Sequence, residues 1–150
     1  IGTNLENRRC PEKVANEITK SFNVFFLDSG AAINHVRSSI EELVDHLSVK
    51  KYDRVDGKLR EISLHKRISI FETKNKQVAD KLYAIKWLGN AGSHPGGISK
   101  DDVLDAYEIL ETVLSYLFDP SHKKIERLVK IVNRKKGPAR GAKRLTSRSS

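Results

Sequence analysis

Methionine is absent from this 150-residue sequence, and cysteine, tryptophan and long hydrophobic runs are scarce. Without a methionine, Ile1 is not an initiator residue, and we expect either a processed chain or a piece of a longer protein. The densest apolar run, at residues 22–27, is far shorter than the ~18 residues that a membrane-spanning helix needs. No signal-peptide pattern opens the chain. These absences predict one domain that does not cross a membrane.

Cysteine and histidine offer little for a metal centre. Cys10 is the only cysteine, which excludes an internal disulfide and fits a reducing compartment. It is either the surviving half of an upstream zinc ribbon or a lone thiol before a helix, and its isolation favours the lone thiol. Four histidines have no metal-ligand spacing with one another: His35, His46, His65 and His122. We therefore predict no metal site, no cofactor and a cytoplasmic location.

Acidic residues are missing from the C-terminal part of the chain. The last is Glu126, and nine basic residues follow it: Arg127, Lys130, Arg134, Lys135, Lys136, Arg140, Lys143, Arg144 and Arg148. With these set aside, 19 Lys and Arg residues balance 19 Asp and Glu residues, so the net charge of +9 belongs to the C-terminus. This pattern is typical of a neutral globule with a basic tail.

Apolar residues at helical spacing predict an all-α fold, a single bundle of five to six helices. The first helix starts at Pro11, and residues 28–30 break it. The second has an apolar stripe that steps by three and four residues: Ile33, Val36, Ile40, Leu43 and Leu47. Residues 50–58 are predicted to be a polar loop. A short third helix holds Leu59, Ile62 and Leu64, although residues 67–71 also fit an extended segment.

Three more helices are expected in the second half of the chain. The fourth carries Val78, Leu82, Ile85 and Leu88 and is predicted to end at Gly89. Ser99 and Asp102 predict a capping box at the start of the fifth helix. Residues 119–121 begin a sixth helix, which runs to Val132.

Beyond Asn133 almost no large apolar side chain remains, so burial cannot offset the cost of ordering the segment. We predict a lead-in at residues 1–10, a helical bundle at 11–133 and a disordered basic tail at 134–150. Dense Lys and Arg favour electrostatic binding of nucleic acid, RNA or DNA, over a role in solubility alone. The predicted nucleic-acid-binding residues are Arg134, Lys135, Lys136, Arg140, Lys143, Arg144 and Arg148.

Arg37 interrupts the apolar stripe of the second helix. It lies four residues after Ile33 and three before Ile40, so its guanidinium needs a partner. Glu41, one turn later, can supply a carboxylate. We favour the interpretation that the pair clamps a neighbouring loop or helix end. The alternative is that Arg37 points into a functional site.

The stretch WLGNAGSHPGG, residues 87–97, combines a helix end with a rigid turn. Asn90 can bond neighbouring backbone groups, and Pro95 prevents His94 from continuing a helix. His94 is then either a general acid or base, because it titrates near neutral pH, or a hydrogen-bonded link between the fourth and fifth helices. Trp87 is expected to cover the turn as part of the core.

Residues 11–118 resemble the family of domain of unknown function 4145. The resemblance rests on Arg37 with Glu41 in the second helix, on Gly89-Asn90 with His94 at the turn, and on the helix after Asp102. The family is found in prokaryotic proteins, often beside restriction endonuclease or helicase modules and zinc ribbons. The resemblance therefore implies a prokaryotic restriction or phage-defence context.

That family is in turn similar to the HEPN (higher eukaryotes and prokaryotes nucleotide-binding) superfamily of helical domains. Many HEPN proteins are dimeric, metal-independent ribonucleases with an Arg, four to six intervening residues and a His. His94 matches the histidine, but Gly89, Leu88 and Trp87 occupy the positions of the arginine. Lys86 is the nearest cation, one residue too far back. A ribonuclease of this kind needs a cation to stabilise charge developing on the phosphate.

Two functions follow from these patterns. The favoured one is a non-catalytic binding or accessory module that contacts nucleic acid through its tail, with Arg37, Glu41, Asn90 and His94 holding the fold. The alternative is a HEPN-type ribonuclease in which His94, beside Asn90, is the acid or base and Lys86 or Arg37 binds the phosphate. Besides nucleic acid, the expected partner is a second copy of the chain or a protein of the defence system, not a membrane.

Overall fold

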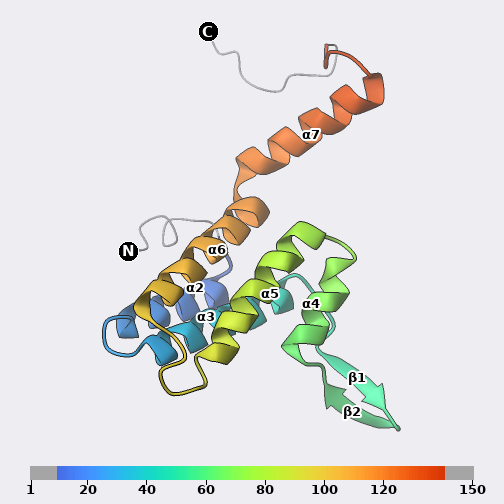
Figure 1. The fold of residues 1–150 in the computed structure, drawn as a ribbon. Helices are drawn as coiled ribbons and strands as arrows, with labels where there is room; N and C mark the ends of the chain where they lie inside the picture. Colours follow the sequence, from blue (N-terminus) through green and yellow to red (C-terminus); the bar gives the residue numbers. More distant parts are fainter. Residues whose placement is uncertain (1–9, 141–150) are drawn as a thin grey trace. The chain divides into compact units, whose positions relative to one another are not determined.

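The computed structural model describes residues 10–140. These residues fall into two compact units, and the boundary between the units in the chain follows Phe118. The first unit contains α2 (Glu12–Val24), α3 (Ser29–His46), β1 (Tyr52–Val55), β2 (Lys58–Glu61), α4 (Leu64–Glu72), α5 (Lys76–Ala91) and α6 (Lys100–Phe118). The second contains α7 (Pro120–Lys135) (Figure 1). The predicted all-α fold is confirmed, with one small hairpin added among the described residues. The bundle predicted at residues 11–133 spans both units.

α3 lies at the centre of the first unit and packs against α2, α4, α5 and α6. Ile33, Val36, Ile40 and Leu43 of its predicted apolar stripe are fully buried, whereas Leu47, just after the helix, is partly buried. Ser21 of α2 joins this centre to α6, because its hydroxyl donates to the Ala32 carbonyl at 2.7 Å and lies 2.7 Å from the Tyr107 hydroxyl. Ser21 has one proton to donate, so Tyr107 must donate to Ser21.

The segment after α3 is a β-hairpin, and the predicted loop at residues 50–58 is wrong. β1 pairs antiparallel with β2 from Tyr52 opposite Glu61 to Val55 opposite Lys58. Asp56 and Gly57 form the turn with φ values of 52° and 74°, the left-handed conformation that a two-residue hairpin turn requires.

The third helix is also placed differently from the prediction. Leu59 belongs to β2 and Ile62 precedes the helix, which begins as α4 at Leu64 with Ser63 as its cap. Residues 67–71 lie within α4, so the extended alternative is wrong. Helical geometry places Leu64, Ile68 and Phe71 on one buried face.

α5 ends later than predicted. It continues through Gly89 to Ala91, and Gly89 is buried in the helix, where an added Cβ would lie 3.2 Å from the Cβ of Arg37. The helix ends at Gly92, which lies so close to Ile33 of α3 that a side chain there would overlap it. Glycine at position 92 therefore allows the end of α5 to pack closely on α3.

The capping box predicted before α6 is confirmed. The backbone N–H of Ser99 donates to the Asp102 carboxylate at 2.8 Å, and the N–H of Asp102 donates to the Ser99 hydroxyl at 3.2 Å. The hydrogen bonds that Ser99 donates lower the pKa of the Asp102 carboxyl. The cap fixes the start of α6 and with it the far end of the turn that contains His94.

α7 extends past the predicted end of the bundle. Arg134 and Lys135, assigned to a disordered tail, form its last turn, and Lys136 ends it in the left-handed conformation, with φ of 51°. Arg140 lies just beyond the helix. The other predicted tail residues, Lys143, Arg144 and Arg148, lie outside the described residues. Within the described range, no helix combines the length and apolar character that a bilayer span requires.

Candidate functional site

The turn between α5 and α6 lies against the turn between α2 and α3. Residues 92–98 and 27–30 together line an open hollow of about 410 Å³. Backbone hydrogen bonds hold the turn in place, because the N–H of His94 donates to the Ala91 carbonyl at 3.2 Å and the N–H of Gly97 donates to the His94 carbonyl at 3.0 Å. The close packing of Gly92 on Ile33 adds to them.

His94 and Asn90 are both exposed, and neither side chain has a hydrogen-bond partner among residues 10–140. The hydrogen-bonded link predicted for His94 is therefore not formed within that range. The main chain and the Ser99–Asp102 cap hold the corner instead. The imidazole of His94 is available to solvent at the rim of the hollow.

Arg37 makes the predicted ion pair with Glu41, with 3.7 Å between its Nε and Oε1 of the carboxylate. This Nε is buried and has no hydrogen-bond partner within the described part of the chain. The aliphatic stem of Arg37 lies on Gly89 of α5, which has no side chain to hold it away. Gly89 thus allows α3 and α5 to approach closely. The side chain of Arg37 lies at the edge of the contact between the two helices and is partly exposed to solvent.

Lys86 lies one turn before Gly89 on the same face of α5 and is only 4% exposed. Its Nζ is 3.2 Å from the centroid of the Trp87 ring, a cation–π contact. Burial and the nearby charge of Arg37 lower the pKa of the Lys86 ammonium. Trp87 itself is 57% exposed, so the prediction that it belongs to the core is wrong.

The residues of the ribonuclease hypothesis thus occupy two different places. His94 lines the hollow beside residues 27–30, whereas the lining of that hollow, as far as the chain is described, includes neither Arg37 nor Lys86. Arg37 and Lys86 lie together at the seam of α3 and α5. The structure brings the two cations together but does not place the histidine with them.

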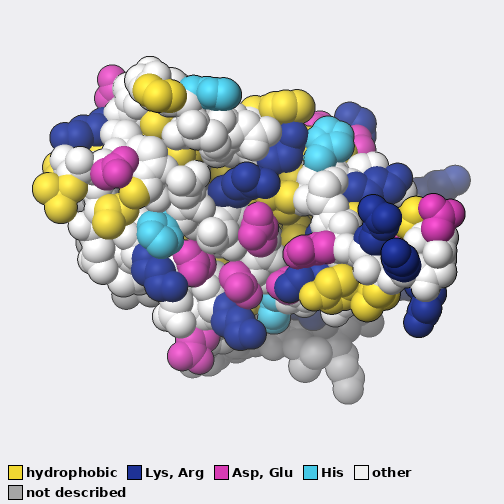
Figure 2. Space-filling view, turned by 90° about the horizontal axis from the view of Figure 1, so that it is seen from below, with side chains coloured by type: hydrophobic (Ala, Val, Ile, Leu, Met, Phe, Trp, Pro, Cys, Tyr) yellow, Lys and Arg dark blue, Asp and Glu magenta, His cyan; other side chains and the backbone are white. Residues whose placement is uncertain are grey.

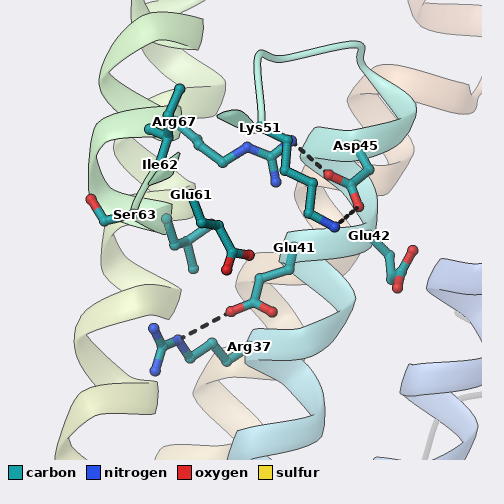
Figure 3. A pocket seen from close by; sticks show the side chains of 10 residues that line it. Arg37, Glu41, Glu42, Asp45, Lys51, Glu61, Ile62, Ser63 and Arg67 are labelled. Atoms are coloured by element: carbon teal, nitrogen blue, oxygen red, sulfur yellow. Dashed lines mark ion pairs between the residues drawn. The ribbon is translucent and has the colours of Figure 1, made fainter. Parts of the chain in front are cut away.

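A second open cleft, of about 360 Å³, lies where α3, the hairpin and the start of α4 meet (Figure 3). Its charged lining residues are Arg37, Glu41, Glu42, Asp45, Lys51, Glu61 and Arg67. Asp45 pairs with Arg67 at 2.6 Å and with Lys51 at 3.9 Å. Across residues 10–140, no group of three or more His, Cys, Asp or Glu side chains is arranged to hold a metal ion. The charges of this cleft largely neutralise one another.

Arg67 is a key residue of the cleft that the sequence analysis missed. It is buried, and besides Asp45 it donates from Nε to the Lys50 carbonyl at 3.1 Å and from Nη2 to the Val49 carbonyl at 2.8 Å. It therefore ties α4 to the chain that leaves α3. Its position one residue before Ile68 on the buried face of α4 was the available signal, and the ambiguous assignment of residues 67–71 concealed it.

His35, His46 and Cys10 have ordinary packing roles. His35 pairs with Glu17 at 3.0 Å, and the ring of His46 lies 5.7 Å from that of Phe118. Cys10 is half-buried against the core, and burial raises the pKa of its thiol. Within the described residues, the surroundings of Cys10 therefore disfavour the reactive thiolate form.

α7 has two chemically distinct faces. Four large apolar residues between 38% and 56% exposed share one face: Ile125, Leu128, Val129 and Val132. Four of its six basic residues, spaced by four, three and four, share the opposite face: Lys123, Arg127, Lys130 and Arg134. No residue of α7 is buried. The helix is therefore a basic amphipathic helix.

The boundary between the two units is also a boundary in charge. Residues 119–150 contain eleven Lys and Arg residues and only two acidic ones, Asp119 and Glu126, which gives them the whole net charge of +9. The 17 basic and 17 acidic residues of the first unit cancel. Figure 2 shows Asp and Glu side chains intermixed with Lys and Arg over most of the face drawn.

The sequence matches the family described as Domain of unknown function (DUF4145) over residues 19–137, most of the chain. The chain belongs to this family. No curated protein and no solved structure matches it. The DUF4145 match ends two residues after α7, whereas the resemblance noted in the sequence stopped at residue 118. α7 is thus part of the family domain and not an appended tail.

Proposed function

We propose that this DUF4145 domain is a non-catalytic accessory module that binds nucleic acid through the basic face of α7 and the residues that follow it. The observation that carries the proposal is the concentration of the entire net charge in residues 119–150. A one-signed, locally dense charge attracts polyanions, and release of their counterions drives binding.

The geometry of α7 suits a nucleic-acid backbone. The four basic residues from Lys123 to Arg134 line one face over about 16 Å of helix. One strand of a B-form duplex carries one phosphate for about every 3.4 Å of the duplex axis, so this face spans an axial length that contains about five phosphates of one strand. The last turn adds Lys135, and no acidic residue follows Glu126 to oppose them.

The separation of His94 from the cations supports a binding role over a ribonuclease. Acid–base catalysis on RNA needs a histidine and a charge-stabilising cation at the same phosphate. His94 lines one hollow, and Arg37 and Lys86 lie at another seam of the first unit. The family resemblance adds the proposed setting, the cytoplasm of a prokaryotic restriction or phage-defence system, where a second copy or a defence protein is the expected partner.

The proposal is tested on the full chain with Lys123, Arg127, Lys130 and Arg134 all changed to Gln. Fluorescence anisotropy of a labelled single-stranded oligonucleotide, measured over a range of salt concentrations, should show affinity at low salt reduced by at least about tenfold. The slope of log affinity against log salt should fall by about 0.7 for each phosphate that the variant no longer binds. A matched control changes four exposed cations of the first unit to Gln: Lys13, Lys58, Arg60 and Lys74.

Equal losses in both variants would mean that net charge alone matters, and the assignment to α7 would then be wrong. The same incubations, with RNA in the presence of a chelator, also test the enzyme hypothesis. RNA should keep its full length with the wild type and with His94→Ala. Cleavage by the wild type that disappears in His94→Ala, with the fold intact, would replace the binding module with the ribonuclease.

A further inference from the structure

α4 and α5 run side by side (Figure 1). Together they carry three neighbouring rings. The imidazole of His65 lies 5.2 Å from the ring of Tyr83 and 6.1 Å from that of Trp87, between centroids. Tyr83 and Trp87 are four residues apart on α5 and therefore share a face. Trp87 is the only tryptophan in the sequence, and more than half of it is exposed.

One cation lies over the Trp87 ring, and a second cation, Arg37, lies near the first. Lys86 holds its Nζ over the Trp87 ring, and within the described residues it has no carboxylate partner. The stem of Arg37 lies on Gly89, one turn along α5 from Lys86. Four carboxylates line the cleft of Figure 3 with Arg37, and that of Glu41 forms an ion pair with it, at 3.7 Å from its Nε. A buried ammonium with a positively charged neighbour is stabilised when an anion lies next to both.

We propose that Lys86, Trp87 and His65, together with Arg37, form a binding site for an unpaired nucleotide of single-stranded RNA or DNA. The base stacks on the exposed rings, and the phosphate lies by the two cations. Stacking of bases on aromatic side chains, with cations that follow the backbone, is the usual chemistry of single-strand binding. Paired bases are stacked on one another and cannot reach the rings, so the site excludes duplexes.

This inference deepens the proposed function and rests on it. The two sites bind different parts of the ligand. α7 attracts any polyanion, whereas the site at Trp87 binds only a strand whose bases are unpaired. A polyanion without bases, inorganic polyphosphate, should therefore engage α7 only. This difference allows the two sites to be tested separately.

Trp87 emission reports directly on the site in the full chain. A single-stranded oligo(dT) or oligo(U) should quench it in a saturable manner, whereas a blunt duplex of equal length and polyphosphate should not. In anisotropy measurements, Trp87→Ala should lower affinity for the single strand by about 5- to 150-fold and leave polyphosphate binding unchanged. Trp87→Phe, which keeps a ring, should recover most of the affinity.

Lys86→Met keeps the buried stem and removes the charge. It should weaken single-strand binding and reduce the salt slope by about 0.7, as expected for one phosphate contact. Phe26→Ala is the matched control, because Phe26 is also exposed, at 69%, and has Lys100 Nζ 5.6 Å from its ring. It should bind as the wild type does, and circular dichroism should show that every variant is folded.

The outcomes separate the two proposals. If oligo(dT) and polyphosphate change Trp87 emission equally, or if Trp87→Ala binds single strands like the wild type, the stacking site is wrong while α7 stands. If quenching by oligo(dT) persists in the variant with four Gln substitutions in α7, the stacking site stands independently. If no oligonucleotide binds even at low salt, both proposals fail.

Discussion

Ser21 is buried among α2, α3 and α6, and its hydroxyl bonds both the Ala32 carbonyl and the Tyr107 hydroxyl. Burial raises the pKa of Tyr107 more than the bond to Ser21 lowers it. The neutral phenol is thus favoured in the folded state. The protonated phenol of Tyr107 therefore stabilises the folded state fully at a pH below the ordinary tyrosine pKa of about 10. This stabilisation is lost as the pH rises through the raised pKa that Tyr107 has in the folded protein.

Tyr107→Phe should lower the free energy of unfolding by about 1 kcal/mol, because Ser21 keeps its bond to Ala32. Ser21→Ala should cost about 2 kcal/mol, since it leaves the Tyr107 hydroxyl buried without an acceptor. The double variant should therefore be more stable than Ser21→Ala alone. Urea unfolding followed by circular dichroism measures all three, and simple addition of the two single effects would contradict this account of the pair.

The candidate site was partly predictable at the scale of single residues. The position of Arg37 on an apolar stripe identified its pair with Glu41, because helical spacing is enough to place both. Lys86 follows Ile85 on the inner face of α5, yet sequence alone gave no reason to bury a charge there. Its contacts depend on Gly89 and Arg37, which come together only when α3 packs on α5.

At the scale of elements, the helices were predictable because each buries a regular stripe, and the hairpin was not. All eight residues of β1 and β2 are exposed, so no alternation of apolar and polar residues marks the strands. The Asp56-Gly57 turn was the available signal. The end of α5 was misplaced for another reason: Gly89 lies within the helix, where it admits the stem of Arg37 from α3, and such a tertiary contact is not visible in the sequence.

Arg67 connects α4 to α3 and to the segment that follows α3, and its removal should destabilise them together. Arg67→Ala should lower the free energy of unfolding by about 3 kcal/mol, because Asp45 and two backbone carbonyls lose a buried partner. Arg67→Lys should recover little of this, since an ammonium cannot reproduce the fork of a guanidinium. Thermal unfolding measures both variants.

Arg54→Ala is the matched control for Arg67, because it removes an arginine from the exposed strand β1. Surface substitutions of this kind are usually within about 0.5 kcal/mol of the wild type. If Arg67→Ala were equally mild, the cleft would have no role in holding α4 to α3, and its ion pairs would be available for binding a ligand.

At the scale of the whole molecule, burial and charge divide the chain at the same point. The residues of the hydrophobic core all precede Tyr116, apart from partly buried neighbours that end at Phe118. α7 has no buried residue. Its basic face lies within residues 119–150, which carry all of the net charge. The first unit thus contains the hydrophobic core, and the second contains the excess positive charge.

This division predicts that a chain ending at Phe118 folds by itself. Its thermal midpoint should lie within about 2 °C of that of the full chain, because no core residue is removed. A chain ending at Ile109 is the control, since it also removes the buried Leu110, Val113 and Leu114 and should not fold cooperatively. Circular dichroism on heating distinguishes the two. A midpoint more than about 5 °C lower for the Phe118 chain would show that α7 stabilises the bundle, and binding defects of α7 variants would then have to be separated from their stability.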